Sequence, residues 1–191
     1  ILAAFGSAQT VFGIYFKLQS FVFMPVFGLN NGMVPIIAYN YGAGHKDRVI
    51  KTIKHSVAYG VGIMFVGLLA MHIFPAQLMR MFDAEESLIA IGAPALETIS
   101  LSFVFAGFCI VAGSVFQALG NGVYSMIVSV ARQMCVLLPV AKLLSLSGEV
   151  TLIWWAFPIA ELASVLLTSY FLVRIYRKVI CHIGEPVVQD A

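Results

Sequence analysis

Apolar residues fill five long segments of the chain, and short polar breaks separate these segments. Each segment is long enough to cross about 30 Å of hydrocarbon as a helix that rises about 1.5 Å per residue. None of them shows the strict alternation of apolar and polar positions that is typical of a membrane barrel strand. The pattern therefore predicts five transmembrane helices, at about 11–39, 56–74, 92–119, 123–146 and 152–173.

The breaks predict sharp reversals of the chain. The first break reads YGAGHKDR, in which Gly42 and Gly44 permit the backbone angles that end one helix and start another. The second break, 75–91, carries apolar residues that suit a short helix lying on the membrane surface. The sequence GNG at 120–122 predicts a tight turn.

The overall composition supports a membrane protein. Hydrophobic residues make up 61% of the chain and charged residues only 10%, whereas soluble domains carry about 25% charged residues. The net charge of +2 is small and gives no indication of nucleic acid binding. The three cysteines lie far apart and have no metal-ligand spacing, so we expect neither a metal site nor a cofactor. The fold class expected is an all-α polytopic membrane protein.

Basic residues gather at the first break and at the end of the fifth apolar segment. With five crossings, these two places lie on the same side of the membrane. This side holds seven basic residues, namely Lys46, Arg48, Lys51, Lys54, Arg174, Arg177 and Lys178. The opposite side holds two near its loops, Arg80 and Lys142. Because basic residues favour the cytoplasmic side, the loop 42–54 and the C-terminus are predicted to be cytoplasmic.

Three stretches of the chain resemble the multidrug and toxic compound extrusion (MATE) family, in particular its MepA-like branch. FMPVFGLNNGMVPIIAYNYGAGHKDRV resembles the eighth helix of the family and the loop that follows it. SVARQMCVLLPV is similar to the eleventh helix, and WWAFPIAELAS is similar to the twelfth. The first stretch is the most specific, and the order and spacing of the other two agree with it.

The resemblance implies a twelve-helix antiporter built from two six-helix lobes. Residues 1–180 would then be a partial C-terminal lobe that holds helices eight to twelve, and 181–191 a polar tail. The chain begins ILAAFGSAQT without a start methionine, so we expect it to be part of a longer protein whose N-terminal lobe supplies the acidic residues of cation coupling. The implied activity is export of small lipophilic cationic drugs against sodium or protons, in a bacterial inner membrane.

Four ionisable residues inside the predicted helices are candidates for a functional role, because a charge there is costly unless it is paired or hydrated. Arg132 and Glu161 lie at a similar depth, roughly 14 Å in, on consecutive antiparallel helices. Lys17 and Glu97 both lie nearer the outer side. Depth therefore predicts that Arg132 pairs with Glu161 and Lys17 with Glu97. Two roles stay open for each pair: part of a substrate or ion pathway, or an ion pair that holds helices together.

The first helix adds three further candidates. Asn31 ends a polar or small stripe, spaced as one helix face, that begins at Lys17. This stripe suits the wall of a cavity, or equally a close helix contact. Pro25 and Pro35 interrupt the backbone hydrogen bonds of the same helix, so they are hinge candidates for alternating access or merely shape its packing.

The sequence favours secondary drug efflux over two other functions. A lipid-linked saccharide flippase of the same superfamily is the alternative, but it should carry more basic residues in its cavity than Lys17 and Arg132. A membrane-embedded enzyme would need paired His or Asp near a membrane surface, and no P-loop, GxSxG or HExxH motif is present. A further alternative is that the chain as given has no activity alone.

Overall fold

The computed structural model describes residues 6–184 of the 191-residue chain, and this part is helical with short connections. The helices are α1 Gly6–Gly42, α2 Lys46–Ile73, α3 Pro75–Arg80, α4 Glu86–Ser100, α5 Phe103–Ala118, α6 Gly122–Val130, the π-helix η2 Ala131–Leu137, α7 Leu138–Ser145, α8 Val150–Ile153, α9 Ala156–Lys178 and the 3₁₀ helix η3 Ile180–His182. Four stretches in this part are long and apolar enough to cross a membrane, or five when the bent pair α4 and α5 counts as one span.

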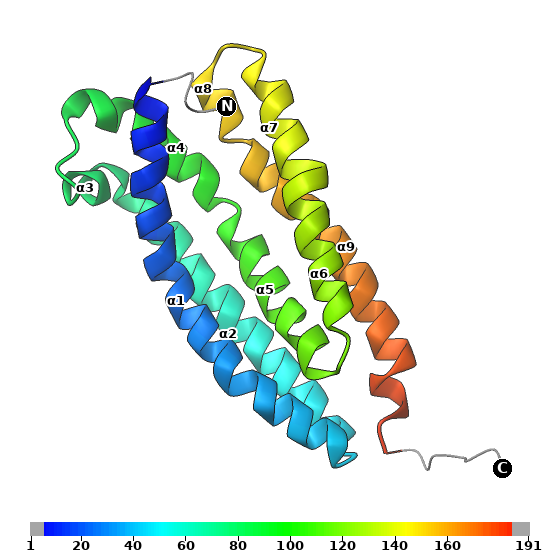
Figure 1. Cartoon of the computed structure of the whole chain (residues 1–191). Helices are drawn as coiled ribbons and strands as arrows, with labels where there is room; N and C mark the ends of the chain where they lie inside the picture. Colours follow the sequence, from blue (N-terminus) through cyan, green and yellow to red (C-terminus); the bar gives the residue numbers. More distant parts are fainter. Residues whose placement is uncertain (1–5, 185–191) are drawn as a thin grey trace.

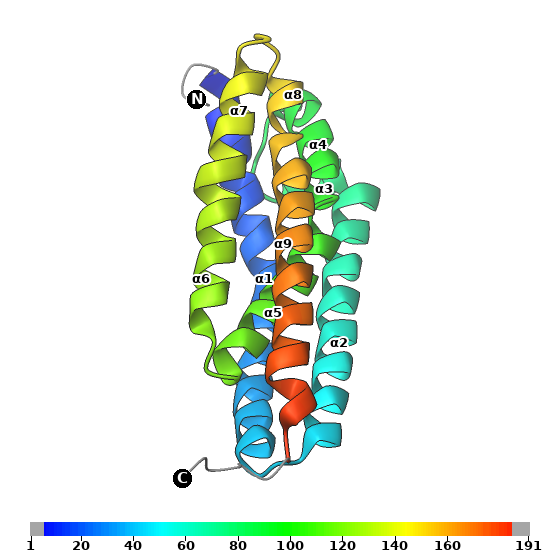
Figure 2. The same cartoon turned by 90° about the vertical axis from the view of Figure 1, so that its right-hand side faces the viewer.

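The five spans form one elongated bundle of antiparallel helices (Figure 1). The turns between α1 and α2 and between α5 and α6 lie at the same end as the end of α9 (Figures 1 and 2). At this end the Lys46 ammonium donates a hydrogen bond to the Cys181 carbonyl oxygen, at 2.7 Å. We call it the basic end, because the seven basic residues counted above belong to it. The fold class predicted from the sequence is therefore confirmed.

The first two spans are longer than the apolar pattern indicates. α1 extends beyond 11–39 at both ends, and α2 begins at Lys46, ten residues before the predicted start at 56. The residues 46–54, predicted as loop, form the first turns of α2. The apolar pattern marks only the part of a helix inside hydrocarbon, whereas charged turns in the headgroup region stay helical. The reversal uses Gly44, whose φ is +73°.

The third span, predicted as one helix over 92–119, is two helices. α4 and α5 meet at an angle of 45°. The Ser102 hydroxyl donates to the Ile99 carbonyl oxygen at 2.6 Å, and the Ser100 hydroxyl to the Glu97 carbonyl oxygen at 2.9 Å. These side-chain hydrogen bonds compete with the backbone N–H groups of a regular helix for the same carbonyl oxygens, which accounts for the break. A short helix, α3, precedes this span, as predicted for 75–91.

The last two spans also differ in detail from the predicted ranges. The fourth runs from Gly122 to Ser145 and includes the π-helix η2. The fifth begins with the short helix α8, and its main helix α9 continues to Lys178, past the predicted end at 173. The division into a lobe over 1–180 and a polar tail over 181–191 stays a prediction, and 185–191 lie outside the described residues.

Glycines allow α2 to approach its neighbours closely. A Cβ atom built on Gly107 of α5 would lie 2.8 Å from the Met64 side chain and 3.0 Å from the Gly60 carbonyl oxygen. A Cβ on Gly67 would lie 2.2 Å from the Val22 side chain of α1. By contrast, a Cβ on Gly62 would have no neighbour within 4 Å. The tight packing of the bundle therefore depends on particular glycines.

Replacing Gly107 with Val should destabilise the protein by about 1–3 kcal/mol, the usual cost of overpacking a core. Gly62→Val is the matched control, because it adds the same side chain to the neighbouring helix in open space. The thermal unfolding midpoint in detergent should fall for Gly107→Val and stay near the wild-type value for Gly62→Val. Equal midpoints for both variants would contradict the close approach of α2 and α5.

Candidate functional site

The ion pair between Arg132 and Glu161 lies inside the bundle, where α9 packs against the fourth span. Arg132 Nη1 donates to Glu161 Oε1 at 2.7 Å, so the pairing predicted from depth is confirmed. The Glu161 side chain is 10% exposed and the Arg132 side chain 33% exposed. Oε2 of Glu161 is buried and has no hydrogen-bond partner among the described residues. This oxygen is therefore available to a proton, a cation or a bound molecule.

Arg132 lies in the π-helix η2, which joins α6 to α7 without a gap. A π segment has a wider turn than an α-helix and often marks a functional site. Pro139, at the start of α7, offers a physical cause. Its ring lacks an N–H and would clash with the carbonyl four residues earlier, that of Cys135, so the preceding turns rearrange. The widened turn positions Arg132 where it reaches α9.

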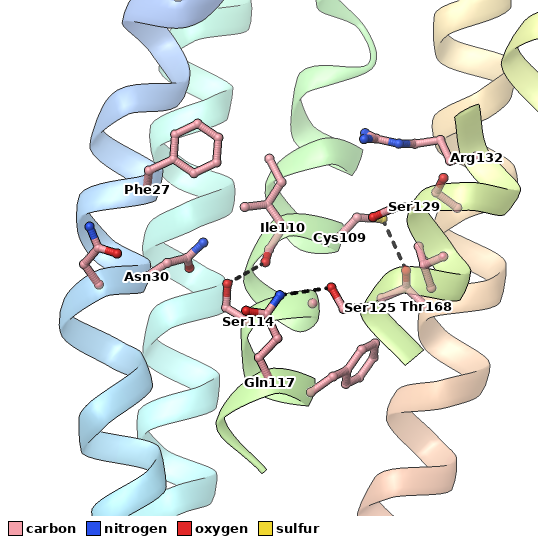
Figure 3. A pocket seen from close by; sticks show the side chains of 15 residues that line it. Phe27, Asn30, Cys109, Ile110, Ser114, Gln117, Ser125, Ser129, Arg132 and Thr168 are labelled. Carbon is pink, nitrogen blue, oxygen red and sulfur yellow. Dashed lines mark hydrogen bonds between the residues drawn. The ribbon is translucent and has the colours of Figure 1, made fainter. Parts of the chain in front are cut away.

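A polar chamber of about 350 Å³ extends from Arg132 toward the basic end. It lies among α1, α5, α6 and α9 (Figure 3). Gln117 Nε2 donates to Ser125 Oγ at 3.2 Å, and the Thr168 hydroxyl donates to the Cys109 sulfur at 3.6 Å. The side chains that line it are mostly amides and hydroxyls, among them Asn30, Asn31, Ser114, Gln117, Ser125, Ser129, Ser164 and Thr168. In a chain of 61% hydrophobic residues such a lining indicates a space built for water or a polar group.

Asn30 is the least satisfied group of the polar chamber. Its side chain is on α1, opposite Arg132 across the chamber (Figure 3). Asn30 is 7% exposed, and its Oδ1 is buried without a hydrogen-bond partner in the described part of the chain. Buried polar atoms are normally paired, so an unpaired acceptor facing a cavity indicates a partner that comes and goes, such as water or a ligand.

An aromatic chamber of about 580 Å³ extends from the ion pair toward the other end of the bundle. Phe12 and Phe157 stack in its wall with ring centroids 6.0 Å apart, and the Tyr15 ring centroid lies 6.1 Å from that of Phe157. Trp154 and Glu161 also line this space. An apolar aromatic wall beside a carboxylate favours the binding of a lipophilic cation.

Arg132 alone, of the described residues, lines both chambers. Its guanidinium group extends from η2 at the edge of the polar chamber (Figure 3), and its partner Glu161 lines the aromatic chamber. The ion pair thus forms the partition between a polar space and an aromatic space. The ion pair therefore lies in contact with both spaces.

The predicted pairing of Lys17 with Glu97 is wrong. No ion pair joins them; the Lys17 ammonium lies 5.6 Å from the centroid of the Phe82 ring instead. Lys17 is exposed and Glu97 half-buried. Similar depth fixes only one coordinate of a residue and does not specify the direction of its side chain. Their role in a pathway stays a prediction.

Asn31 is exposed on α1 and lines the rim of the polar chamber. The stripe from Lys17 to Asn31 lies on the outward face of α1, since Met24 and Gly28 of the same stripe are exposed as well. Within this chain it is therefore not a close helix contact. Pro25 and Pro35 both lie inside the continuous helix α1, and their role as hinges stays a prediction.

Sequence reasoning missed three features of the site: Asn30, Gln117 and the π-helix. Asn30 is next to Asn31 in the first apolar segment, and Gln117 lies in the third apolar segment. Each is a polar residue in a predicted membrane helix, which was the signal that the sequence offered. Pro139 in the fourth segment was the signal for the irregular helix.

Comparison with known proteins identifies the family. The MatE family model matches residues 6–143, well over half of the chain. The chain is 26% identical over 178 residues to the multidrug export protein MepA of Staphylococcus haemolyticus, covering 93% of this chain and 39% of that protein. It is 28% identical over 162 residues to MepA of Staphylococcus aureus, covering 84% of this chain and 35% of that protein. The chain thus spans less than two fifths of the length of these curated relatives.

Solved structures of MATE transporters have the same fold. The MATE multidrug transporter DinF-BH in complex with R6G aligns with a TM-score of 0.81 and 33% identity, over 92% of this chain and 40% of that one. The MATE transporter VcmN of Vibrio cholerae in its bent form aligns with a TM-score of 0.87 and 17% identity, over 95% of this chain and 42% of that one. From the family match over most of its length, the chain belongs to the MATE family.

Proposed function

We propose that this chain is the C-terminal lobe of a longer secondary transporter that exports lipophilic cationic drugs in exchange for sodium ions or protons. The observation that carries the proposal is the buried Glu161 carboxylate, held by Arg132 between a polar and an aromatic chamber. Its oxygen Oε2 can accept a proton or a cation. The multidrug export proteins among the relatives support the same activity.

The chemistry of the two chambers fits such an exchange. Aromatic rings attract an organic cation, and Glu161 supplies the negative charge that a drug cation needs inside the membrane. While Arg132 neutralises Glu161, the aromatic chamber is a poor site for a cation. A proton or sodium ion that binds Glu161 adds a positive charge to the chamber and so disfavours a drug cation there, which couples the binding of the ion to that of the drug.

The exposed stripe of α1 suits a cavity shared with a second lobe. Lys17, Met24 and Asn31 are exposed on α1, although polar groups are costly against lipid. A second lobe across from α1 would enclose a polar cleft there. Rocking of two lobes about such a cleft is a common way for secondary transporters to alternate access.

The activity is tested with the complete polypeptide that contains this sequence, purified into liposomes. Uptake of the lipophilic cation ethidium should follow an imposed sodium or proton gradient, and the gradient that drives it identifies the coupling ion. Absence of dye movement under both gradients would overturn the proposal. Transport of a lipid-linked saccharide instead would support the flippase alternative, which the neutralised charge of Arg132 disfavours.

We infer the sidedness of the bundle from the distribution of its basic residues. With the basic end predicted to be cytoplasmic, a cysteine placed at Asp47, which is exposed at the start of α2, should resist an impermeant thiol reagent in intact cells. Cys109, Cys135 and Cys181 are replaced beforehand to remove the background. Labelling should appear only after the cells are opened, and strong labelling from outside would reverse the assignment.

A further inference from the structure

A groove of about 630 Å³ runs between α1 and α2 on the outside of the bundle, separate from the two chambers. Its α1 wall includes Gly28, Gly32, Ile36 and Asn40, and its α2 wall includes Arg48 and Lys51. The groove is thus apolar at the end nearer the middle of the bundle and cationic at the basic end.

The basic residues at the cationic end are not neutralised by acidic neighbours among the described residues. Arg48 and Lys51 lie in the first two turns of α2, and both are exposed. Neither forms an ion pair within residues 6–184, where the ion pairs are Arg80–Glu86 and Arg132–Glu161. Basic pockets between transmembrane helices at the membrane surface bind anionic lipid headgroups.

The apolar end has most of the length of an acyl chain. From Ile36, which is level with Lys51, to Gly28 the groove follows eight residues of α1, a rise of about 12 Å. The hydrocarbon of one leaflet is about 15 Å thick, half of the bilayer core. Gly28 and Gly32 leave this stretch open, because a Cβ on either would meet nothing within 4 Å.

Asn40 lies at the cationic end of the groove, two residues before the end of α1 at Gly42. It is 7% exposed, and its Nδ2 donates to the Ile36 carbonyl oxygen at 2.8 Å. Asn40 lines the groove, and its Oδ1 is buried and has no partner among the described residues. The unpaired acceptor Asn40 Oδ1 and the two cations Arg48 and Lys51 together favour a ligand that carries both a negative charge and a hydrogen-bond donor.

We propose that this groove binds one anionic phospholipid whose headgroup carries hydroxyl groups, as phosphatidylglycerol does. The phosphodiester lies between Arg48 and Lys51, and a headgroup hydroxyl donates to Asn40 Oδ1. One acyl chain follows the trough along Gly32 and Gly28. A drug cation does not suit this place, because Arg48 and Lys51 repel it.

The test is a titration of the complete polypeptide with phosphatidylglycerol, followed by native mass spectrometry, with phosphatidylcholine as the neutral reference. The double variant Arg48→Gln/Lys51→Gln should lose about tenfold in affinity for phosphatidylglycerol and little for phosphatidylcholine. The matched control is Lys54→Gln/Arg177→Gln, which removes the same charge from the same end but outside the groove. It should retain wild-type affinity.

Two further variants test the trough and the acceptor. Gly32→Leu fills the trough and should weaken lipid binding several-fold, whereas Gly62→Leu adds the same side chain to open space outside the groove and should not. Asn40→Leu should weaken phosphatidylglycerol binding more than phosphatidylcholine binding. Equal affinity of the wild type for the two lipids, equal losses in the two charge variants, or unchanged binding by Gly32→Leu would each overturn the proposal. None of these readouts depends on drug transport.

Discussion

Replacing Arg132 with Leu should destabilise the protein by about 3–5 kcal/mol, more than replacing Arg132 and Glu161 together. The single change leaves the Glu161 carboxylate, whose side chain is 10% exposed, without a counter-charge. The double change to Leu removes both charges, and such replacements of a buried pair are often close to neutral. Glu161→Leu should cost less than Arg132→Leu, because the Arg132 side chain is one third exposed and can reach water.

The same three variants separate a structural role from a functional one. Unfolding midpoints in detergent give the stability of each, and dye uptake into liposomes gives its transport. We expect the double variant to regain stability and still lose transport. Stability losses that simply add would show that the two residues do not interact. A double variant that transports at the wild-type rate would show that the pair only holds α9 against the fourth span.

Replacing Asn30 with Leu should stabilise the protein and impair transport. The change removes a buried acceptor that has no partner, which should raise the free energy of unfolding by about 1 kcal/mol. It also removes a hydrogen bond to whatever occupies the polar chamber, so transport should fall by about tenfold, the equivalent of one such bond.

Asn40→Leu is the matched control for the stability effect. Asn40 lies on the same helix, is equally buried and also has an unpartnered Oδ1, but it lines the outer groove instead of the polar chamber. Both variants should raise the unfolding midpoint, measured in the same detergent. A lower midpoint for Asn30→Leu alone would show that Asn30 has a structural partner, and full transport by that variant would exclude it from the pathway.

The apolar pattern predicts the number and order of the spans but not their irregularities. Long apolar runs are unambiguous, because few structures other than a membrane helix satisfy their backbone in lipid. The bend near Ser102 and the π turn before Pro139 arise from single hydrogen bonds and one missing N–H. Local effects of this size do not change the mean hydropathy of a segment, so the apolar pattern does not predict them.

The same contrast applies to the site. Arg132 and Glu161 are both deep, and a deep charge has few partners, so matching depth is enough to pair them. Lys17 has an alternative that the sequence does not show, the ring of Phe82. The chambers depend on which helix faces turn toward each other, a rotation that neither composition nor depth specifies.

The partition between the chambers has an electrical consequence. If water fills both chambers, and each opens to its own side of the membrane, the insulating layer at this point shrinks from about 30 Å of hydrocarbon to the length of the Arg132–Glu161 contact. Most of the transmembrane voltage then drops across this one ion pair. Moving one elementary charge through the full drop is worth about 2.3 kcal/mol per 100 mV. A swing of the Arg132 side chain from one chamber to the other would therefore carry a gating current, and the resting potential of the cell would bias its position.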